Sequence, residues 1–194
     1  MDYLVLNGAS YPTSYSAGHY RGTDRKEPGY CDAVPDDSEI NCLFRWYVEE
    51  LHRSGAVHDL VRARRYVELC NAYFREQRFE IIEVRRGREQ LGGAGRLLGF
   101  DISNGGYGSS LIFESLLPGP DATIPEQPIL ILSDLLRRYF YPRLNKSGLF
   151  ATFEDAAHCR QTMIALQSFH PDLYEGGDLE DFEVVGIYLV PDAG

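Results

Sequence analysis

The sequence has very little lysine and no apolar run long enough to cross a membrane. Its only lysines are Lys26 and Lys146, whereas arginine is abundant, a coding bias that indicates no function. The longest uncharged apolar run, 128–133, falls far short of the roughly 20 residues that span a bilayer. The N-terminus has neither the basic segment nor the apolar segment of a secretory signal. We therefore expect a cytoplasmic protein without membrane contact.

The usual local motifs of catalysis and metal binding are also missing. The chain has no phosphate-binding loop, no Gly-x-Ser-x-Gly elbow and no His-Glu-x-x-His. The cysteines are far apart and form no Cys-x-x-Cys; they are Cys31, Cys42, Cys70 and Cys159. This spacing predicts reduced thiols, two or three of them packed as small apolar groups, rather than a zinc site or a redox pair. We expect no cofactor and no metal.

Acidic residues exceed basic ones, and the formal net charge is -10 at pH 7. The excess is uneven, because 58–98 is basic whereas 1–57 and 99–194 are acidic. An acidic chain without a dense basic face repels phosphate backbones, which argues against nucleic-acid binding. The same charge favours a basic protein as the partner.

The length of 194 residues and an ordinary composition, 44% hydrophobic and 25% charged, predict one domain that spans 1–194. Strand-like and helix-like segments do not alternate regularly, which favours an α+β fold over a doubly wound sheet. We predict a mainly antiparallel sheet of about four strands, with the N- and C-terminal strands included, packed by about five helices.

Apolar periodicity and capping residues place these elements along the chain. The expected strands are 3–7, 79–84, 96–103 and 181–190, and the expected helices are 39–55, 59–77, 111–116, 128–141 and 152–170. Ser38 and Thr152 are the expected N-caps of two helices, and Gly55 is expected to end one. The last strand is expected at the centre of the sheet beside the N-terminal strand, and 85–95 is expected to be a hairpin connection.

Two of the expected helices carry side chains that matter below. Helix 59–77 is expected to bury Tyr73 and Phe74 and to expose an arginine cluster to solvent, composed of Arg62, Arg64 and Arg65. Helix 128–141 has six apolar positions, which are Ile129, Leu132, Leu135, Leu136, Tyr139 and Phe140.

The glycine-rich stretch 93–99 comes near a dinucleotide-binding pattern, but its context is wrong. A β-like segment follows Gly95, whereas a dinucleotide loop opens a helix and needs an acidic residue about twenty positions on. We therefore expect a turn. Asp101 is a carboxylate within an apolar strand, and it either points outward or is held at a site.

Two helical pairs resemble halves of a carboxylate and histidine metal site, each at spacing i, i+3. They are Glu49 with His52 and Asp155 with His158, and Glu68 or Glu76 would have to complete a di-iron set. Acidic residues are frequent enough to give such pairs by chance, so no metal site is predicted. Cys159 follows His158 directly, and on a helix the two side chains diverge by about 100°, which excludes a nucleophile and base pair.

Residues 8–37 are predicted to form one long loop rich in tyrosine, glycine and proline. Loops of this length are usually functional or disordered, and the aromatic content favours an ordered loop on the surface. It either covers one edge of the sheet or provides anchors for a partner. Four tyrosines lie in it, namely Tyr11, Tyr15, Tyr20 and Tyr30.

The sequence favours a binding protein that acts through protein–protein contact, for which an immunity-type inhibitor of a bacterial toxin is the specific hypothesis. The candidate binding residues are the four loop tyrosines together with Asp36, Asp37, Asp101, Asp178, Glu180 and Asp181. One alternative is an enzyme or small-ligand-binding protein with Asp101, His158, Glu49 and His52 as its functional groups. Another is a scaffold that acts by self-association.

Overall fold

The computed structural model describes residues 1–7, 38–74, 78–87, 95–104, 111–112, 128–170 and 179–191. Its centre is a four-stranded antiparallel sheet of order β1-β2-β4-β3, built from β1 (Asp2–Asn7), β2 (Phe79–Arg86), β3 (Arg96–Asn104) and β4 (Phe182–Leu189). The predicted antiparallel α+β fold of four strands is therefore confirmed.

The order of the strands differs from the prediction in two ways. β4 is central, as expected, but it pairs with β2 and β3 and not with β1, so it does not lie beside the N-terminal strand. β2 and β3 do not form a hairpin, because β4 lies between them. Both errors follow from the pairing of β4 with β2 and β3, segments far from β4 in sequence, which hydrophobic pattern alone does not determine.

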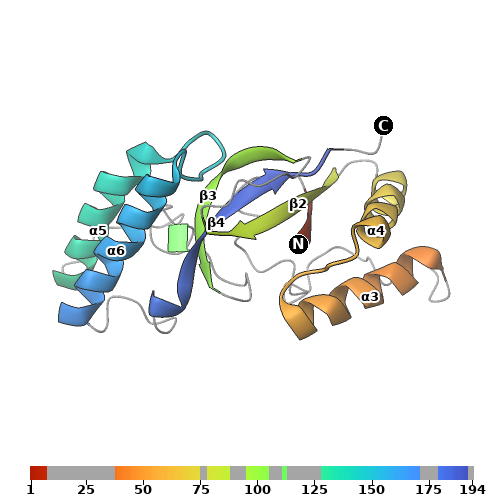
Figure 1. The fold of residues 1–194 in the computed structure, drawn as a ribbon, viewed down its shortest axis with the longest axis horizontal. Helices are drawn as coiled ribbons and strands as arrows, with labels where there is room; N and C mark the ends of the chain where they lie inside the picture. Colours follow the sequence, from red (N-terminus) through yellow and green to blue (C-terminus); the bar gives the residue numbers. More distant parts are fainter. Residues whose placement is uncertain are drawn as a thin grey trace.

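One pair of helices packs at the β1 and β2 side of the sheet (Figure 1). α3 (Glu39–Ser54) begins at Ser38, whose side chain accepts from the Asn41 amide, and ends at Gly55 with φ 76°. α4 (Leu60–Tyr73) begins at Asp59, whose side chain accepts from the Arg62 amide. The predicted caps of α3 are thus observed.

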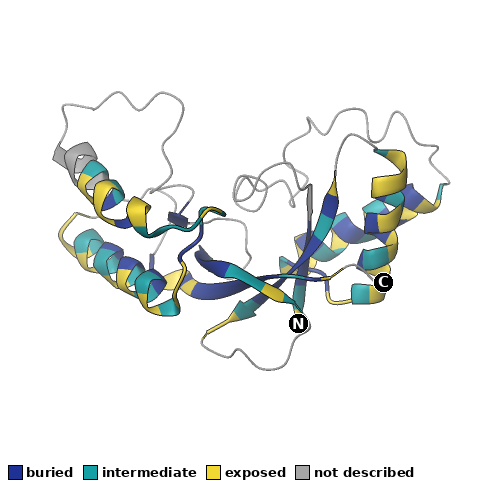
Figure 2. Ribbon diagram, turned by 90° about the horizontal axis from the view of Figure 1, so that it is seen from above, coloured by how far each residue is buried: buried dark blue, intermediate teal, exposed yellow. Residues whose placement is uncertain are grey.

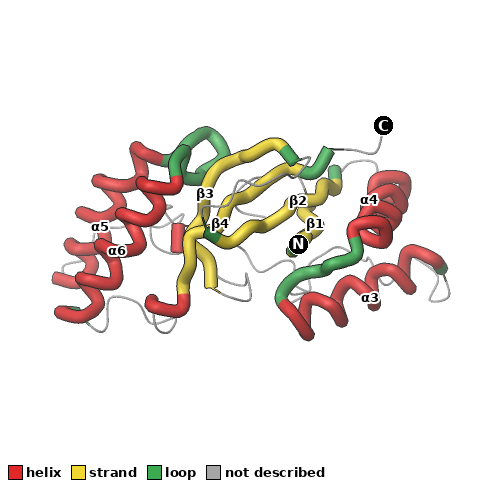
Figure 3. The backbone as a smooth tube through the Cα atoms, in the orientation of Figure 1, coloured by secondary structure: helices red, strands yellow, loops and turns green. Residues whose placement is uncertain are grey.

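The second pair of helices lies beyond the other end of the sheet, where α6 packs on β3 and β4 (Figures 1 and 3). It consists of α5 (Pro128–Phe140) and α6 (Phe153–Phe169), joined through the short 3-10 helix η3 (Tyr141–Arg143). Thr152 caps α6 as predicted, accepting from the Asp155 amide. A further 3-10 turn, η5 (Leu179–Asp181), leads into β4.

The described residues thus contain four α-helices and not five. Of the helix predicted at 111–116, only Leu111 and Ile112 are described, and both are buried. In α4, Tyr73 is 54% exposed, contrary to prediction, and Tyr66 is buried instead, stacked on Tyr47 of α3.

The core runs through both helix pairs and the sheet between them, and the strands are its most continuously buried part (Figure 2). Side chains on both faces of the strands are buried, including Leu4 and Ile82 on one face and Ile102 on the other. Within the described residues, no helix is both long enough and apolar enough to cross a membrane.

Candidate functional site

On both outer strands of the sheet, β1 and β3, outward-facing backbone groups form hydrogen bonds with residues that do not belong to a strand. At the β1 edge, the backbone of Tyr3 exchanges hydrogen bonds of 2.8 and 2.9 Å with Val57, which follows α3. Two residues further on, the Tyr47 hydroxyl accepts from the Val5 amide at 2.9 Å and donates to the Val5 carbonyl at 3.2 Å. These contacts occupy the backbone groups with which an added strand would pair.

The β3 edge is closed in the same manner from the other helix pair. Phe150 exchanges backbone hydrogen bonds of 2.8 and 2.9 Å with Phe100, and the Asn145 amide donates to the Leu98 carbonyl at 2.8 Å. Gly99 lies between them at φ 153°, where a Cβ atom would stand 2.7 Å from Leu149 Cβ and 2.8 Å from the Phe150 carbonyl. Gly99 therefore belongs to a bulged strand, as the predicted strand 96–103 requires, and not to the turn expected for 93–99, and it lets the 145–150 loop approach β3.

Arg160 of α6 links the start of β4 to the helix. The ladder between β2 and β4 ends at Arg86 and Val185, so Phe182 lies past the end of β2. The Arg160 Nε donates to the Phe182 carbonyl, and its Nη2 donates to the Glu180 carbonyl at 2.9 Å. Two of the guanidinium nitrogens are thus used to hold η5 and β4 against α6.

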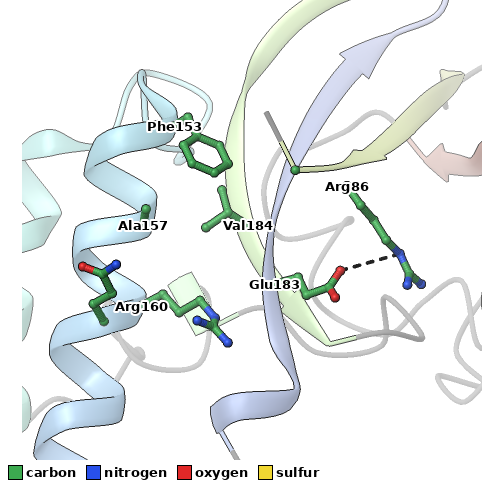
Figure 4. A pocket seen from close by; sticks show the side chains of 8 residues that line it. Arg86, Phe153, Ala157, Arg160, Glu183 and Val184 are labelled. Atoms are coloured by element: carbon green, nitrogen blue, oxygen red, sulfur yellow. Dashed lines mark ion pairs between the residues drawn. The ribbon is translucent and has the colours of Figure 1, made fainter. Parts of the chain in front are cut away.

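A groove of about 640 Å³ opens beside this contact, between α6 and the ends of β2 and β4 (Figure 4). Its described lining consists of Arg86, Gly87, Phe153, Ala157, Arg160, Gln161, Glu183 and Val184. Figure 4 shows Arg160 on the α6 side, while Arg86 and Glu183 point toward each other on the far side of β4. The Arg86–Glu183 pair is loose, at 3.8 Å, with both side chains about half exposed.

Asp101 points inward and is completely buried, which resolves its orientation. Its Oδ1 accepts from the Ile102 amide at 2.7 Å. The carboxylate also acts on Cys159 of α6, whose pKa is raised to about 12 mainly by burial and secondarily by the charge of Asp101. A thiol with such a pKa is protonated at neutral pH, so Cys159 is not a nucleophile in this conformation.

A second buried charge lies on β2. Glu83 and Arg85 form a two-pronged ion pair of 2.8 and 2.9 Å, with side chains only 5% and 13% exposed. The Arg85 guanidinium also stacks on the Tyr188 ring at 4.2 Å. The Glu83 hydrogen bonds raise the pKa of Arg85, so the guanidinium stays charged. Because they satisfy each other, this pair is part of the packing of the sheet.

The two helical carboxylate and histidine pairs do not meet. Glu49 and His52 are on α3, whereas Asp155 and His158 are on α6 at the opposite end of the molecule (Figure 1). Asp155 is engaged in capping α6 with Thr152 and lies 3.5 Å from Arg143. Glu76 lies outside the described residues, and within these residues no group of three His, Cys, Asp or Glu is placed to hold a metal ion.

The α5–α6 pair exposes an aromatic surface that the sequence analysis missed. Leu135 and Tyr139 lie one turn apart on α5 and are 57% and 52% exposed, and Tyr141 follows at 47%. Arg143 stacks on the Tyr139 ring at 4.1 Å, and the exposed His158 packs edge-on against Tyr139 at 6.1 Å. We call these residues the Tyr139 face; they are Leu135, Tyr139, Tyr141, Arg143 and His158.

The sequence does contain a signal for this face. The apolar positions of α5 form two parallel i, i+4 pairs, Leu135 with Tyr139 and Leu136 with Phe140. Neighbouring positions on a helix point about 100° apart, so packing on one side of the helix cannot bury both pairs. Leu136 and Phe140 are buried, and the other pair is exposed.

Most of the candidate binding residues lie outside the described residues: Tyr11, Tyr15, Tyr20, Tyr30, Asp36, Asp37 and Asp178. Of the remainder, Asp101 is buried, whereas Glu180 and Asp181 are exposed on η5 next to α6. The described residues include 14 arginines and lysines and 15 acidic residues, so nearly all of the excess negative charge is in the other segments.

The comparisons with known proteins give no relative: no family model, no curated protein and no solved structure matches this chain. Any argument about function therefore depends on the geometry described above.

Proposed function

We propose that this protein binds another protein through the Tyr139 face, and that its partner carries positive charge. The observation that supports the proposal is the exposure of Leu135 and Tyr139, side by side on one helix and flanked by a stacked arginine. Tyrosine and arginine are enriched in the residues that contribute most to binding, and a rigid aromatic side chain loses little entropy when it is buried.

The closed edges of the sheet favour a helix face over an added strand. At Tyr3, Val5, Leu98 and Phe100 the outward backbone groups already have partners, so a partner strand cannot pair there without displacing them. The positive charge of the partner is inferred from the net charge of -10, which steers oppositely charged proteins into contact. Glu180 and Asp181 are acidic residues of η5, which Arg160 of α6 contacts through the Glu180 carbonyl, so acidic groups lie beside the α5–α6 pair.

In its specific form, we propose an immunity-type inhibitor whose partner is a toxic protein that loses activity in the complex. No catalytic role is assigned to this chain. A partner obtained by affinity capture from the native cells would be purified, and its affinity would be measured for the wild type and for two double variants. Leu135→Ala/Tyr139→Ala removes the two central side chains of the Tyr139 face, and Val61→Ala/Tyr73→Ala removes two exposed side chains from α4, 80% and 54% exposed.

The first double variant should weaken binding by about 30-fold or more, because truncated anchor residues cost about 2 kcal/mol or more. The second should bind as tightly as the wild type, and added salt should weaken both the wild type and this control. Equal affinities of the two double variants would refute binding through the Tyr139 face. A partner that stays fully active in the complex would refute the proposal that this protein is an inhibitor.

A further inference from the structure

The groove between α6 and β4 has the size and the lining of a small-ligand site that is separate from the Tyr139 face. Its volume of about 640 Å³ lies within the range of roughly 300–1,000 Å³ that ligand pockets usually occupy. The α6 residues that line it, 153, 157, 160 and 161, recur at helical spacing and form one stripe. His158 of the Tyr139 face is not part of this stripe.

Arg160 provides a cation in the groove, and hydrogen bonds fix the position of its side chain. Its bonds to the Phe182 and Glu180 carbonyls use Nε and one hydrogen of Nη2. A guanidinium has five N–H donors, so three remain, including both on Nη1. Because the side chain is already held in place, a bound anion does not have to immobilise it, and the planar donor fork matches a carboxylate.

An apolar surface adjoins this cation. Val184 is 7% exposed, and Phe153 and Ala157 are half-buried beside it. The Phe153 ring packs edge-on against Phe100 at 6.0 Å and 87°, which fixes its orientation. Figure 4 shows Val184 pointing toward α6, between Phe153 and Arg160.

The charge of the groove is opposite in sign to that of the chain. Arg86 and Glu183 form an ion pair on the far side of β4, so Arg160 is the charged residue of the described lining on the α6 side, within a protein of net charge -10. The glutamate, Glu183, is turned toward Arg86 at 3.8 Å, so its repulsion of an anion is partly offset. The local charge therefore favours an anionic ligand, and the apolar surface favours one with a hydrocarbon body.

We propose that this groove binds a small hydrophobic carboxylate, with its carboxylate on Arg160 and its hydrocarbon part on Phe153, Ala157 and Val184. The test titrates the full chain with three probes and monitors binding by NMR. The probes are phenylacetate, hexanoate, and phenylacetamide, which is the uncharged counterpart of phenylacetate. Phenylacetate or hexanoate should shift the amide signals of 153–161 and 182–184, and phenylacetamide should bind at least about tenfold more weakly.

Three variants locate the site. Arg160→Gln should weaken carboxylate binding about tenfold or more, since it removes the charge-assisted hydrogen bonds. Gln161→Trp places a bulky ring in the groove from an exposed position and should also abolish binding, which covers the case in which loss of Arg160 disturbs the fold. Arg138→Gln on α5 is the matched control, because it removes an exposed arginine outside the groove and should leave binding unchanged.

Failure of both carboxylates to bind at about 10 mM would overturn the proposal. So would equal binding of phenylacetamide, or full binding by both the Arg160→Gln and Gln161→Trp variants. These outcomes are independent of the Tyr139 face, because the face is tested with variants on α5 and a protein partner, and the groove is tested without any partner.

Discussion

The hydroxyl of Tyr47 accepts from the amide of Val5 and donates to the carbonyl of the same residue, although 42 positions separate the two in sequence. One side chain of α3 thereby provides both hydrogen bonds that a neighbouring strand would give to the edge of β1. Asn145 and Phe150 close the opposite edge, at β3. At these residues, both outer strands of the sheet already have hydrogen-bond partners outside the sheet.

Tyr47→Phe tests this closure directly. The variant keeps the ring stacked on Tyr66 but leaves the buried amide and carbonyl of Val5 without their partner. We expect the free energy of unfolding to fall by about 1 to 3 kcal/mol in urea titrations. Tyr73→Phe is the control, since Tyr73 is largely exposed and its hydroxyl remains hydrated. Equal stabilities of the two variants would contradict the closure.

Alanine substitutions at Gly99 and Gly87 form a matched pair that tests the contact at the β3 edge. Both have positive φ, 153° and 71°, so alanine is strained at either position. A Cβ at Gly99 would also collide with Leu149 and the Phe150 carbonyl, whereas a Cβ at Gly87 meets nothing within 4 Å. Gly99→Ala should therefore be less stable than Gly87→Ala by about 1 to 3 kcal/mol, as measured by urea unfolding. A smaller cost at Gly99 than at Gly87 would refute the close approach of the 145–150 loop.

The Glu83–Arg85 pair should matter far more than an exposed pair of the same chemistry. Glu83→Gln leaves the buried Arg85 charge uncompensated and should cost about 3 to 5 kcal/mol of stability. Glu68→Gln breaks the pair with Arg65 on the surface of α4, where the two side chains are 60% and 49% exposed, and should cost far less stability. Urea unfolding of the two variants compares the costs, and comparable losses would show that Glu83 is not buried in solution.

The thiols should differ in reactivity as their exposure does. At about pH 8, iodoacetamide should modify the exposed Cys42 and leave Cys70 and Cys159 intact until urea is added. Peptide mass spectrometry identifies the labelled positions. Labelling of Cys159 in the folded protein as fast as that of Cys42 would show that α6 does not cover it.

Cys159 also makes the stability of the fold depend on pH, and the direction of this dependence follows from its raised pKa. Its pKa in the fold is raised from about 9 to about 12, so the neutral thiol is favoured by folding. The resulting stability is fully present below about pH 9 and is lost as the pH rises toward 12. Cys159→Ala should consequently lose less stability than the wild type between about pH 8 and pH 10.5 in urea titrations. The same loss of stability in both proteins would show that a group other than Cys159 causes the pH dependence.

Local chemistry predicted the parts of this fold that depend on neighbouring residues. Ser38, Gly55 and Thr152 cap helices as expected, because a capping side chain and the amides it serves are three residues apart. The strand order was wrong, since the pairing of β4 with β2 and β3 joins residues 78 to 107 positions apart and depends on which faces the helices cover.

The candidate sites were harder to predict for a similar reason. Asp101 was singled out as a carboxylate within an apolar strand, but the sequence left open whether it points outward or inward, and only the folded structure shows that it is completely buried. Leu135 and Tyr139 look like ordinary apolar positions in the sequence, and only the structure shows that Leu136 and Phe140 occupy the buried side of α5 instead. The groove joins residues from three elements, β2, α6 and β4, so no single stretch of sequence contains its pattern.

The most direct test of the account is hydrogen exchange of the protein alone and in complex with its purified partner. The account predicts that binding slows exchange in 134–143 and 153–162, the segments that carry the Tyr139 face, and leaves α3 and α4 unchanged. Protection confined to α3 and α4, or to the edge strands β1 and β3, would contradict binding through that face.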